Sequence, residues 1–85
     1  MYIIQDVYYI YVLPMEKEEV LKMVGERIRE IRKEKGISQK QLAHTINKDQ
    51  QSIQRLEAGK INPSIYYLFE IADGLKIDIA QLLKI

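Results

Sequence analysis

The fold of this chain is decided by residues 38–60, which read SQKQLAHTINKDQQSIQRLEAGK. Ser38 and Gln41, three residues apart, match the capping box, in which each side chain accepts a hydrogen bond from the other residue's backbone N–H. A helix is therefore predicted from here to Asn47, a residue type that tolerates the left-handed conformation at a helix end. Asp49 suits the N-cap of a second helix, and Gly59 suits its C-terminal end.

These two predicted helices are short, and only two or three residues join them. That is the geometry of a helix-turn-helix. The apolar periodicity places Leu42 and Ile46 of the first helix against Ile53 and Leu56 of the second. Ala43 lies on the same inner face, where its small side chain lets the two helices approach closely.

The exposed side of the second helix carries the residues that point to a function. Glutamine can both donate to and accept from the N7 and N6 edge of adenine, and arginine bonds guanine O6 and N7 in a bidentate way. On a lone amphipathic helix such residues would be an ordinary solvent-facing surface, but here they coincide with a helix pair and a tight turn. We therefore predict that these side chains read DNA bases, namely Gln50, Gln51, Gln54 and Arg55.

Cations and polar groups flank this base-reading surface. Lysine side chains, and the free N–H groups at a helix start, are suited to binding DNA phosphates. The predicted contacts to the DNA backbone are Gln39, Lys40, Lys48, Ser52 and Lys60. Asp49 places a negative charge close to the same surface, which argues against a phosphate beside that residue.

Upstream of this pair, residues 16–35 have the pattern of a longer amphipathic helix. Acidic residues crowd its first turn and basic residues its last, as the helix dipole favours. Gly36 is expected to end it in a left-handed conformation. Its core-facing residues are predicted to be Val20, Val24, Ile28 and Ile31.

Two further helices are predicted downstream. Ser64 is a good N-cap for the first of them, and Asp78 with Gln81 repeats the capping box for the second. The first is expected to turn Ile65, Leu68, Phe69, Ala72 and Leu75 inward, and the second carries Ile79, Leu82 and Leu83. The predicted fold is therefore all-α, with five helices in a domain spanning residues 15–85.

Residues 1–14 differ in character from the rest of the chain. They are rich in tyrosine and β-branched residues and end at Pro14, which predicts a β-strand extension. Their apolar run is too short to span a bilayer, and no basic segment precedes it, so neither a membrane helix nor a secretory signal is expected. A lone strand must pair with a symmetry mate, pack on the helices or stay loose.

Composition excludes several classes of function. A chain of 85 residues has room for one small domain, and the absence of cysteine with a single histidine, His44, excludes thiolate catalysis and a multi-ligand zinc site. We expect no enzyme, no metal and no cofactor. The formal charge is only +1, but it is unevenly distributed: −3 over residues 1–21, +5 over 22–60 and −1 over 61–85. The basic middle indicates a surface that faces a polyanion, although mixed charges on a solvated helix face would give a similar pattern.

Residues 25–83 resemble the Cro/C1-type helix-turn-helix family of phage repressors and bacterial regulators. The resemblance is carried by GERIR at 25–29, GISQ at 36–39, QLA at 41–43, SI at 52–53, LEAGK at 56–60 and NPS at 62–64, with Ile71, Ala72 and Leu75. It implies a lambda-repressor-like domain in which Gln50, Gln51 and Arg55 touch base edges while Gln39 and Lys40 clamp the backbone. It also implies that Arg32 and Glu57 form a partly buried ion pair between two helices.

The chain departs from the family pattern at three places. The turn reads Asn47-Lys48-Asp49 instead of glycine, a hydrophobic residue and serine or threonine. Ala58 replaces a polar or basic residue and removes a candidate phosphate contact. The glycine usual after Leu75 is missing, so either Lys76 adopts a positive φ or the helix ends early at Gly74.

These observations predict a cytoplasmic, nucleoid-associated transcriptional regulator, a repressor that binds a pseudo-palindromic operator in double-stranded DNA as a homodimer. The dimer contact is expected from the N-terminal strand, the C-terminal helix or both, since the two ends of the chain carry a surplus of apolar residues. The alternatives are an antitoxin, a restriction–modification controller, or a bridging module whose main contact is another protein.

Overall fold

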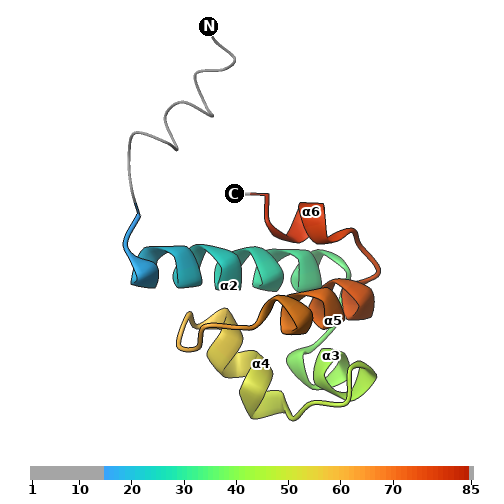
Figure 1. Ribbon diagram of the computed structural model, residues 1–85. Coiled ribbons are helices and arrows are strands. Elements are labelled where there is room, and N and C mark those ends of the chain that lie inside the picture. The colour runs from blue at the N-terminus through green and yellow to red at the C-terminus, as the bar shows by residue number, and fades with distance from the viewer. Residues whose placement is uncertain (1–14, 85) are drawn as a thin grey trace, which may run out of the picture.

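The computed structural model describes residues 15–84, which form five helices (Figure 1). They are α2 (Lys17–Glu34), α3 (Gln39–Thr45), α4 (Gln50–Glu57), α5 (Ile65–Leu75) and α6 (Ile79–Leu82). The prediction of five helices in an all-α fold is confirmed. The predicted N-terminal strand lies in residues 1–14, outside the described part of the chain.

The helix starts follow local sequence rules. The Ser38 hydroxyl accepts from the Gln41 N–H at 3.0 Å, and Gln41 Oε1 accepts from the Ser38 N–H at 2.7 Å, which completes the capping box. Asp49 Oδ1 accepts from the Ser52 N–H at 2.8 Å, and Ser64 Oγ accepts from the Tyr67 N–H at 3.0 Å. Each of these side chains satisfies a backbone donor that has no partner inside its own helix.

The helix ends use the left-handed backbone conformation. Gly36 and Gly59 have φ of 69° and 72° after α2 and α4, and Asn47 has φ of 58° after α3. After α5 the same conformation falls on Lys76, with φ of 58°. The helix therefore runs on to Leu75, and a lysine takes the strained position where glycine would be at ease.

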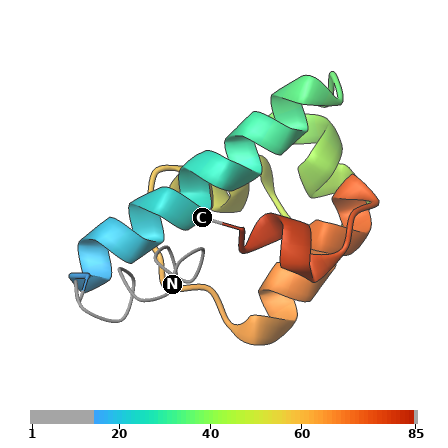
Figure 2. The same ribbon diagram turned by 90° about the horizontal axis from the view of Figure 1, so that it is seen from above.

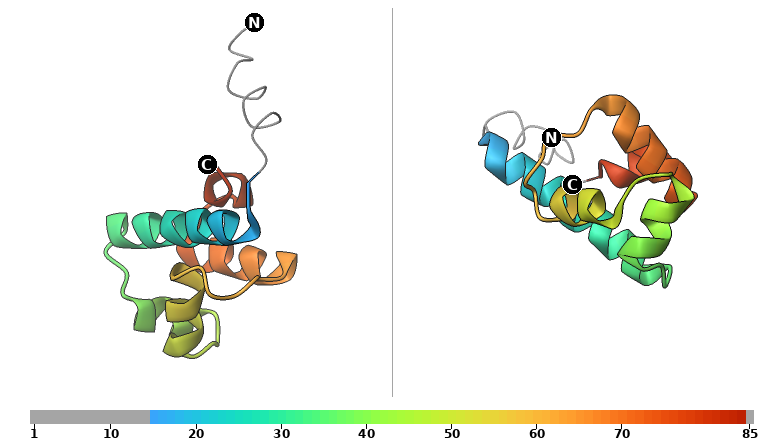
Figure 3. Two further views of the ribbon diagram at one scale, coloured as in Figure 1. Left: turned by 90° about the vertical axis from the view of Figure 1, so that its left-hand side faces the viewer. Right: turned by 90° about the horizontal axis from the view of Figure 1, so that it is seen from below.

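The five helices form a small bundle around one core. The longest helix, α2, crosses above α4 and α5 in Figure 1, and α6 lies along its upper side. Seen from above, α6 sits between α2 and α5, with which it packs (Figure 2). Seen from below, α3 and α4 lie side by side on the near face (Figure 3, right), so the helix-turn-helix forms one outer face of the domain.

The core confirms most of the predicted apolar faces and corrects three positions. Its fully buried side chains are Ile28, Leu42, Ile53, Leu56, Ile71, Leu75 and Leu82. In contrast, the prediction of an inward position was wrong for Val20, Ile65 and Phe69, which are exposed; Leu83 is exposed as well.

Helix geometry explains these exposed positions. The buried stripe of α5 follows the i, i+3, i+4, i+7 pattern of Leu68, Ile71, Ala72 and Leu75, and residues 65 and 69 lie beside it. Val20 is in the first turns of α2, where residues 15–20 are all exposed. Residue 83 follows the fully buried Leu82 and therefore turns away from the core.

Gly25 allows the close approach of α2 to α4. A Cβ atom on Gly25 would lie 2.5 Å from the carbonyl oxygen of Glu57 and 2.6 Å from that of Leu56. Both are backbone atoms that cannot move aside. The absence of a side chain at this position therefore sets the distance between α2 and the C-terminal end of α4.

Candidate nucleic-acid interface

The turn between α3 and α4 is held by backbone hydrogen bonds. The Lys48 N–H donates to the Ala43 carbonyl at 2.8 Å, and the Asn47 N–H donates to the His44 carbonyl at 3.2 Å. Ala43 itself is buried at the contact between α3 and the rest of the core. This arrangement reverses the chain over residues 46–49 and fixes the direction in which α4 leaves the turn.

The outer face of α4 is polar along its whole length. Its buried residues are Ile53, Leu56 and Glu57. The predicted base-reading residues are all exposed: Gln50, Gln51, Gln54 and Arg55. Their exposure fits a reading surface, and their contact with bases stays a prediction.

Arg32 and Glu57 join α2 to the end of α4 by a buried ion pair. The guanidinium donates from Nε to Glu57 Oε2 at 2.7 Å and from Nη2 to Oε1 at 3.0 Å. The two side chains are only 8% and 3% exposed. Because the hydrogen bond to Glu57 outweighs the opposite effect of burial, the pKa of Arg32 is raised above its already high ordinary value. The Arg32 guanidinium therefore keeps its positive charge in this pair.

The same carboxylate holds the start of α3. Gln39 Nε2 donates to Glu57 Oε1 at 2.9 Å, and Arg32 Nη1 donates to the Ile37 carbonyl at 2.8 Å. One buried charge pair thus anchors α2, the loop before α3, α3 itself and α4 in a fixed relative orientation. Gln39 also lines an open groove of about 620 Å³ between these helices, together with Arg29, Gln50 and Gln54 among others.

A second polar network ties the turn to α5. Lys48 Nζ lies 3.3 Å from Glu70 Oε1 and 5.4 Å from the centre of the Tyr67 ring. The hydroxyl oxygens of Tyr67 and Ser52 are 2.6 Å apart, a hydrogen bond in which either can donate. Lys48 and Ser52 are predicted backbone contacts, and both have partners on α5 inside the protein, whereas Lys40 and Lys60 are exposed.

Comparison with known proteins identifies the family. The sequence profile of the helix-turn-helix family, of the Cro/C1 type, matches residues 28–82. The chain belongs to this helix-turn-helix family. It is also 31% identical over 64 residues to y4dJ, an uncharacterized HTH-type transcriptional regulator of Sinorhizobium fredii, a match that covers 75% of this chain and 83% of that protein. The resemblance predicted from the sequence is thereby confirmed.

Solved structures agree with this assignment. The restriction-modification controller protein C.AhdI of Aeromonas hydrophila superposes with a TM-score of 0.76 at 31% identity, covering 80% of this chain and 99% of that one. The clp gene regulator ClgR of Corynebacterium glutamicum superposes with a TM-score of 0.74 at 22% identity, covering 84% and 87%. The second likeness shows the shared fold alone.

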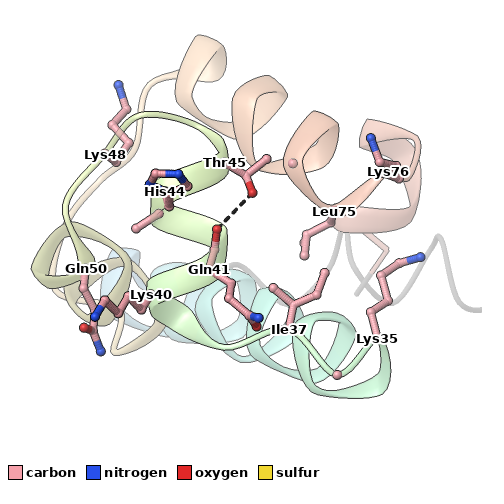
Figure 4. Close-up of a pocket in the computed structure, with 13 residues that line it drawn as sticks. Lys35, Ile37, Lys40, Gln41, His44, Thr45, Lys48, Gln50, Leu75 and Lys76 are labelled. Atoms are coloured by element: carbon pink, nitrogen blue, oxygen red, sulfur yellow. Dashed lines mark hydrogen bonds between the residues drawn. The ribbon is translucent and has the colours of Figure 1, made fainter.

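A broad groove lies along the outer face of α3 in this helix-turn-helix domain (Figure 4). Its volume is about 1050 Å³, and the residues described around it include no aspartate or glutamate. Its basic residues are Lys35, Lys40, Lys48, Lys76 and His44. His44 is exposed on α3. Through Lys40 and Gln50 the groove adjoins the polar face of α4, so positive charge extends beyond the helix-turn-helix itself.

Sequence reasoning missed an apolar patch on this domain. Ile65, Tyr66 and Phe69 are 65%, 73% and 50% exposed on the first half of α5. The periodicity of α5 admits two adjacent apolar stripes, so no signal in the sequence separates these residues from the buried stripe of Leu68 and Ile71.

Two further features are absent from the described residues. In residues 15–84, no cluster of three or more His, Asp or Glu side chains is arranged to hold a metal ion. Over the same range, none of the helices combines the length and the apolar character that a bilayer crossing requires.

Proposed function

We propose that this member of the helix-turn-helix family is a sequence-specific DNA-binding transcriptional regulator, a repressor that acts as a homodimer on a pseudo-palindromic operator. The observation that carries the proposal is the polar outer face of α4, fixed in direction by the buried pair of Arg32 and Glu57. The relatives named as an HTH-type transcriptional regulator and a restriction-modification controller support it. A protein with this function acts in the cytoplasm, on the DNA of the nucleoid.

In this proposal α4 enters the major groove and its exposed side chains read base edges. The reading residues are Gln50, Gln51, Gln54 and Arg55, and the backbone contacts are Gln39, Lys40, Lys48, Ser52 and Lys60. Gln39 is held in place because its Nε2 donates to Glu57 at 2.9 Å, which leaves the second Nε2 hydrogen and the backbone N–H as donors to a phosphate at the start of α3.

A dimer brings two copies of α4 into successive major grooves. The two half-site centres then lie roughly 34 Å apart, as in other helix-turn-helix dimers. The proposed contact involves residues 1–14, α6 or both. Leu82 of α6 is buried in the domain core, and Leu83, which follows the helix, is exposed. The exposed patch of Ile65, Tyr66 and Phe69 is a third surface of suitable character.

Light scattering of the chain starting at Met15, compared with the full chain, tests the first of these surfaces. Loss of the dimer supports a contact through residues 1–14. An unchanged dimer excludes that contact, and Phe69→Glu in the full chain then tests the patch on α5.

Selection of bound sites from a random pool of double-stranded DNA tests the whole proposal. We expect a pseudo-palindrome whose half-sites have the spacing given above. Gln50→Ala is expected to lose roughly 1–3 kcal/mol on the selected site only, because a base contact is removed. Lys40→Ala is expected to weaken binding to all sequences alike, because a phosphate contact carries no sequence information. An enriched pool without any recurring sequence would refute specific recognition.

A second candidate function is that of a bridging or antitoxin-type module whose main contact is another protein. The observation that favours it is the apolar patch of Ile65, Tyr66 and Phe69, which is unusual on a small monomer. The salt dependence of DNA binding separates the two functions. The three lysines proposed as backbone contacts in each chain, Lys40, Lys48 and Lys60, give six phosphate contacts per dimer and a slope of log K against log[salt] near −5. A bridging module would show little binding to DNA at any salt concentration.

A further inference from the structure

The Ser52 hydroxyl is the one functional group on the inner edge of α4 that is both predicted to meet a DNA phosphate and bonded inside the protein. Ser52 is the third residue of α4 and is partly buried. Its backbone N–H is already taken by the Asp49 carboxylate at 2.8 Å. The hydroxyl is therefore the only donor that this residue can offer to DNA.

The partner of that hydroxyl is Tyr67, which is held in place from three directions. Its backbone N–H donates to Ser64 Oγ at 3.0 Å. Its ring lies beneath Lys48 Nζ, which is itself paired with Glu70 at 3.3 Å. The phenol oxygen then reaches Ser52 Oγ at 2.6 Å, a short distance for two neutral hydroxyls.

The direction of this hydrogen bond decides what Ser52 can do. A phenol is more acidic than an aliphatic alcohol and is the stronger donor, while the serine hydroxyl has two lone pairs and is the better acceptor. When Tyr67 donates, the proton of Ser52 stays free and its own donor strength rises, because hydrogen bonds in a chain polarise one another.

The Ser52 hydroxyl can direct that proton into a cavity that is open to solvent beside the base-reading residues. Ser52 lines a small open cavity of about 200 Å³ together with Asp49, Gln51, Arg55 and Ile61. Gln51 and Arg55 are two of the proposed reading residues, so a duplex placed against them brings its backbone past this cavity. Arg55 provides a positive charge at the same place, which offsets the carboxylate of Asp49.

We infer that Tyr67 is a positioning residue for DNA recognition: its phenol donates to Ser52 Oγ and so directs the Ser52 hydroxyl proton to a phosphate of the operator. The inference rests on the proposed function. Through the Tyr67 hydroxyl, α5 then helps to set the position of α4 along the duplex.

Tyr67→Phe tests this with the loss of one oxygen and no change in the ring. Measured on the operator that the wild-type chain selects from a random duplex pool, its affinity is expected to fall about three- to tenfold, the value of one neutral hydrogen bond. Tyr66→Phe is the matched control: the same atom is removed from the neighbouring residue, whose side chain is 73% exposed, and affinity is expected to stay unchanged. The salt slope is expected to stay the same in both variants, because a neutral hydroxyl releases no counterion.

Two further measurements separate positioning from a merely structural role. In the Ser52→Ala background, Tyr67→Phe is expected to have no further effect on affinity; if the two losses multiply, the inference is overturned. In a scan of operators with single methylphosphonate substitutions, the wild-type chain is expected to be sensitive at several phosphates in each half-site, and the sensitivity at one of them is expected to vanish in both Ser52→Ala and Tyr67→Phe.

The comparison of the wild-type chain with Ser52→Ala also serves if Tyr67→Phe fails to fold. A scan without any phosphate that depends on Ser52 would overturn the inference while leaving specific DNA binding intact. Failure of the wild-type chain to enrich any sequence would instead overturn the proposed function, and the inference with it.

Discussion

Glu57→Gln is the substitution whose effect follows most directly from the structure. It removes one negative charge with almost no change in shape. Glu57 is 3% exposed in its side chain and accepts hydrogen bonds from Arg32 at 2.7 and 3.0 Å and from Gln39 at 2.9 Å. In the variant, an amide N–H₂ group replaces one acceptor oxygen and meets a donor, and the Arg32 guanidinium stays buried without a counter-charge.

Breaking a buried pair on one side costs about 3–5 kcal/mol, a large share of the stability of so small a domain. Each kcal/mol shifts the Tm of a domain of this size by about 4–8 °C, so the Tm is expected to fall by more than about 10 °C. Thermal unfolding followed by far-UV circular dichroism measures it.

Glu30→Gln provides the matched control. It makes the same chemical change in the pair of Arg27 and Glu30, whose atoms are 3.7 Å apart and whose side chains are 28% and 67% exposed. Such a surface pair contributes only about 0.2–1 kcal/mol. If Glu57→Gln lowered the stability no more than Glu30→Gln, burial of the Arg32 pair would add nothing to the cost of breaking it, and the expected difference would be refuted.

The double variant Arg32→Met with Glu57→Leu separates the effect of the ion pair on stability from its role in orienting the start of α3. Replacing both charges by apolar side chains of similar volume removes the desolvation cost, so much of the lost stability is expected to return. Gln39, however, loses its acceptor, and affinity for operator DNA is expected to stay low. Recovery of both stability and affinity would show that the pair does not orient the start of α3.

Three smaller predictions concern the backbone and the charge around the helix-turn-helix. Gly25→Ala is expected to destabilise the fold by about 1–3 kcal/mol, because its Cβ would stand 2.5 Å from a backbone carbonyl; urea unfolding measures this, and a neutral result would show that α2 and α4 can separate freely. Lys76→Gly is expected to stabilise the fold by about 0.5–1 kcal/mol in the same urea unfolding assay, because φ is 58° at this residue. Lys35→Gly is the control: it lies at a right-handed C-cap with φ of −87° and is expected to destabilise the fold. Equal effects of the two substitutions would contradict backbone strain at Lys76. Asp49→Asn keeps an N-cap but removes a negative charge beside the proposed DNA surface, so affinity for all sequences is expected to rise by up to about fivefold in a fluorescence anisotropy titration, and a fall would place the DNA elsewhere.

The helix boundaries were predictable because short-range chemistry decides them. Ser38 with Gln41, Asp49 and Ser64 each bond a backbone N–H three residues away, and that spacing can be recognised in the sequence. The left-handed ends at Gly36, Asn47 and Gly59 follow the same logic, whereas the sequence left open the choice between Lys76 and Gly74, and the structure has the positive φ at Lys76. The only long-range contact implied beforehand, the pair of Arg32 and Glu57, came from the family resemblance.

The side of α5 that faces the core depended on tertiary packing. Ile65 and Phe69 are as hydrophobic as Leu68 and Ile71, so the periodicity admits two adjacent stripes, and only the positions of α3 and α6 decide which is buried. The same holds for the bond between Ser52 and Tyr67, whose partners lie 15 residues apart on different helices. No local sequence pattern predicts such a contact.

The internal ion pairs change how the basic charge of residues 22–60 acts. Arg32 is neutralised by Glu57, Lys48 lies beside Glu70 and Arg27 beside Glu30, so three of its cations already have carboxylate partners before DNA arrives. Lys40 and Lys60 remain as exposed lysines close to α4, with Arg55 on the helix itself. A surface with so few free cations gives modest affinity for DNA of any sequence, because each phosphate neutralised contributes separately. In the proposed function, discrimination between DNA sequences therefore comes from polar groups held in fixed directions, and the structure supplies two networks, centred on Glu57 and Tyr67, that hold them.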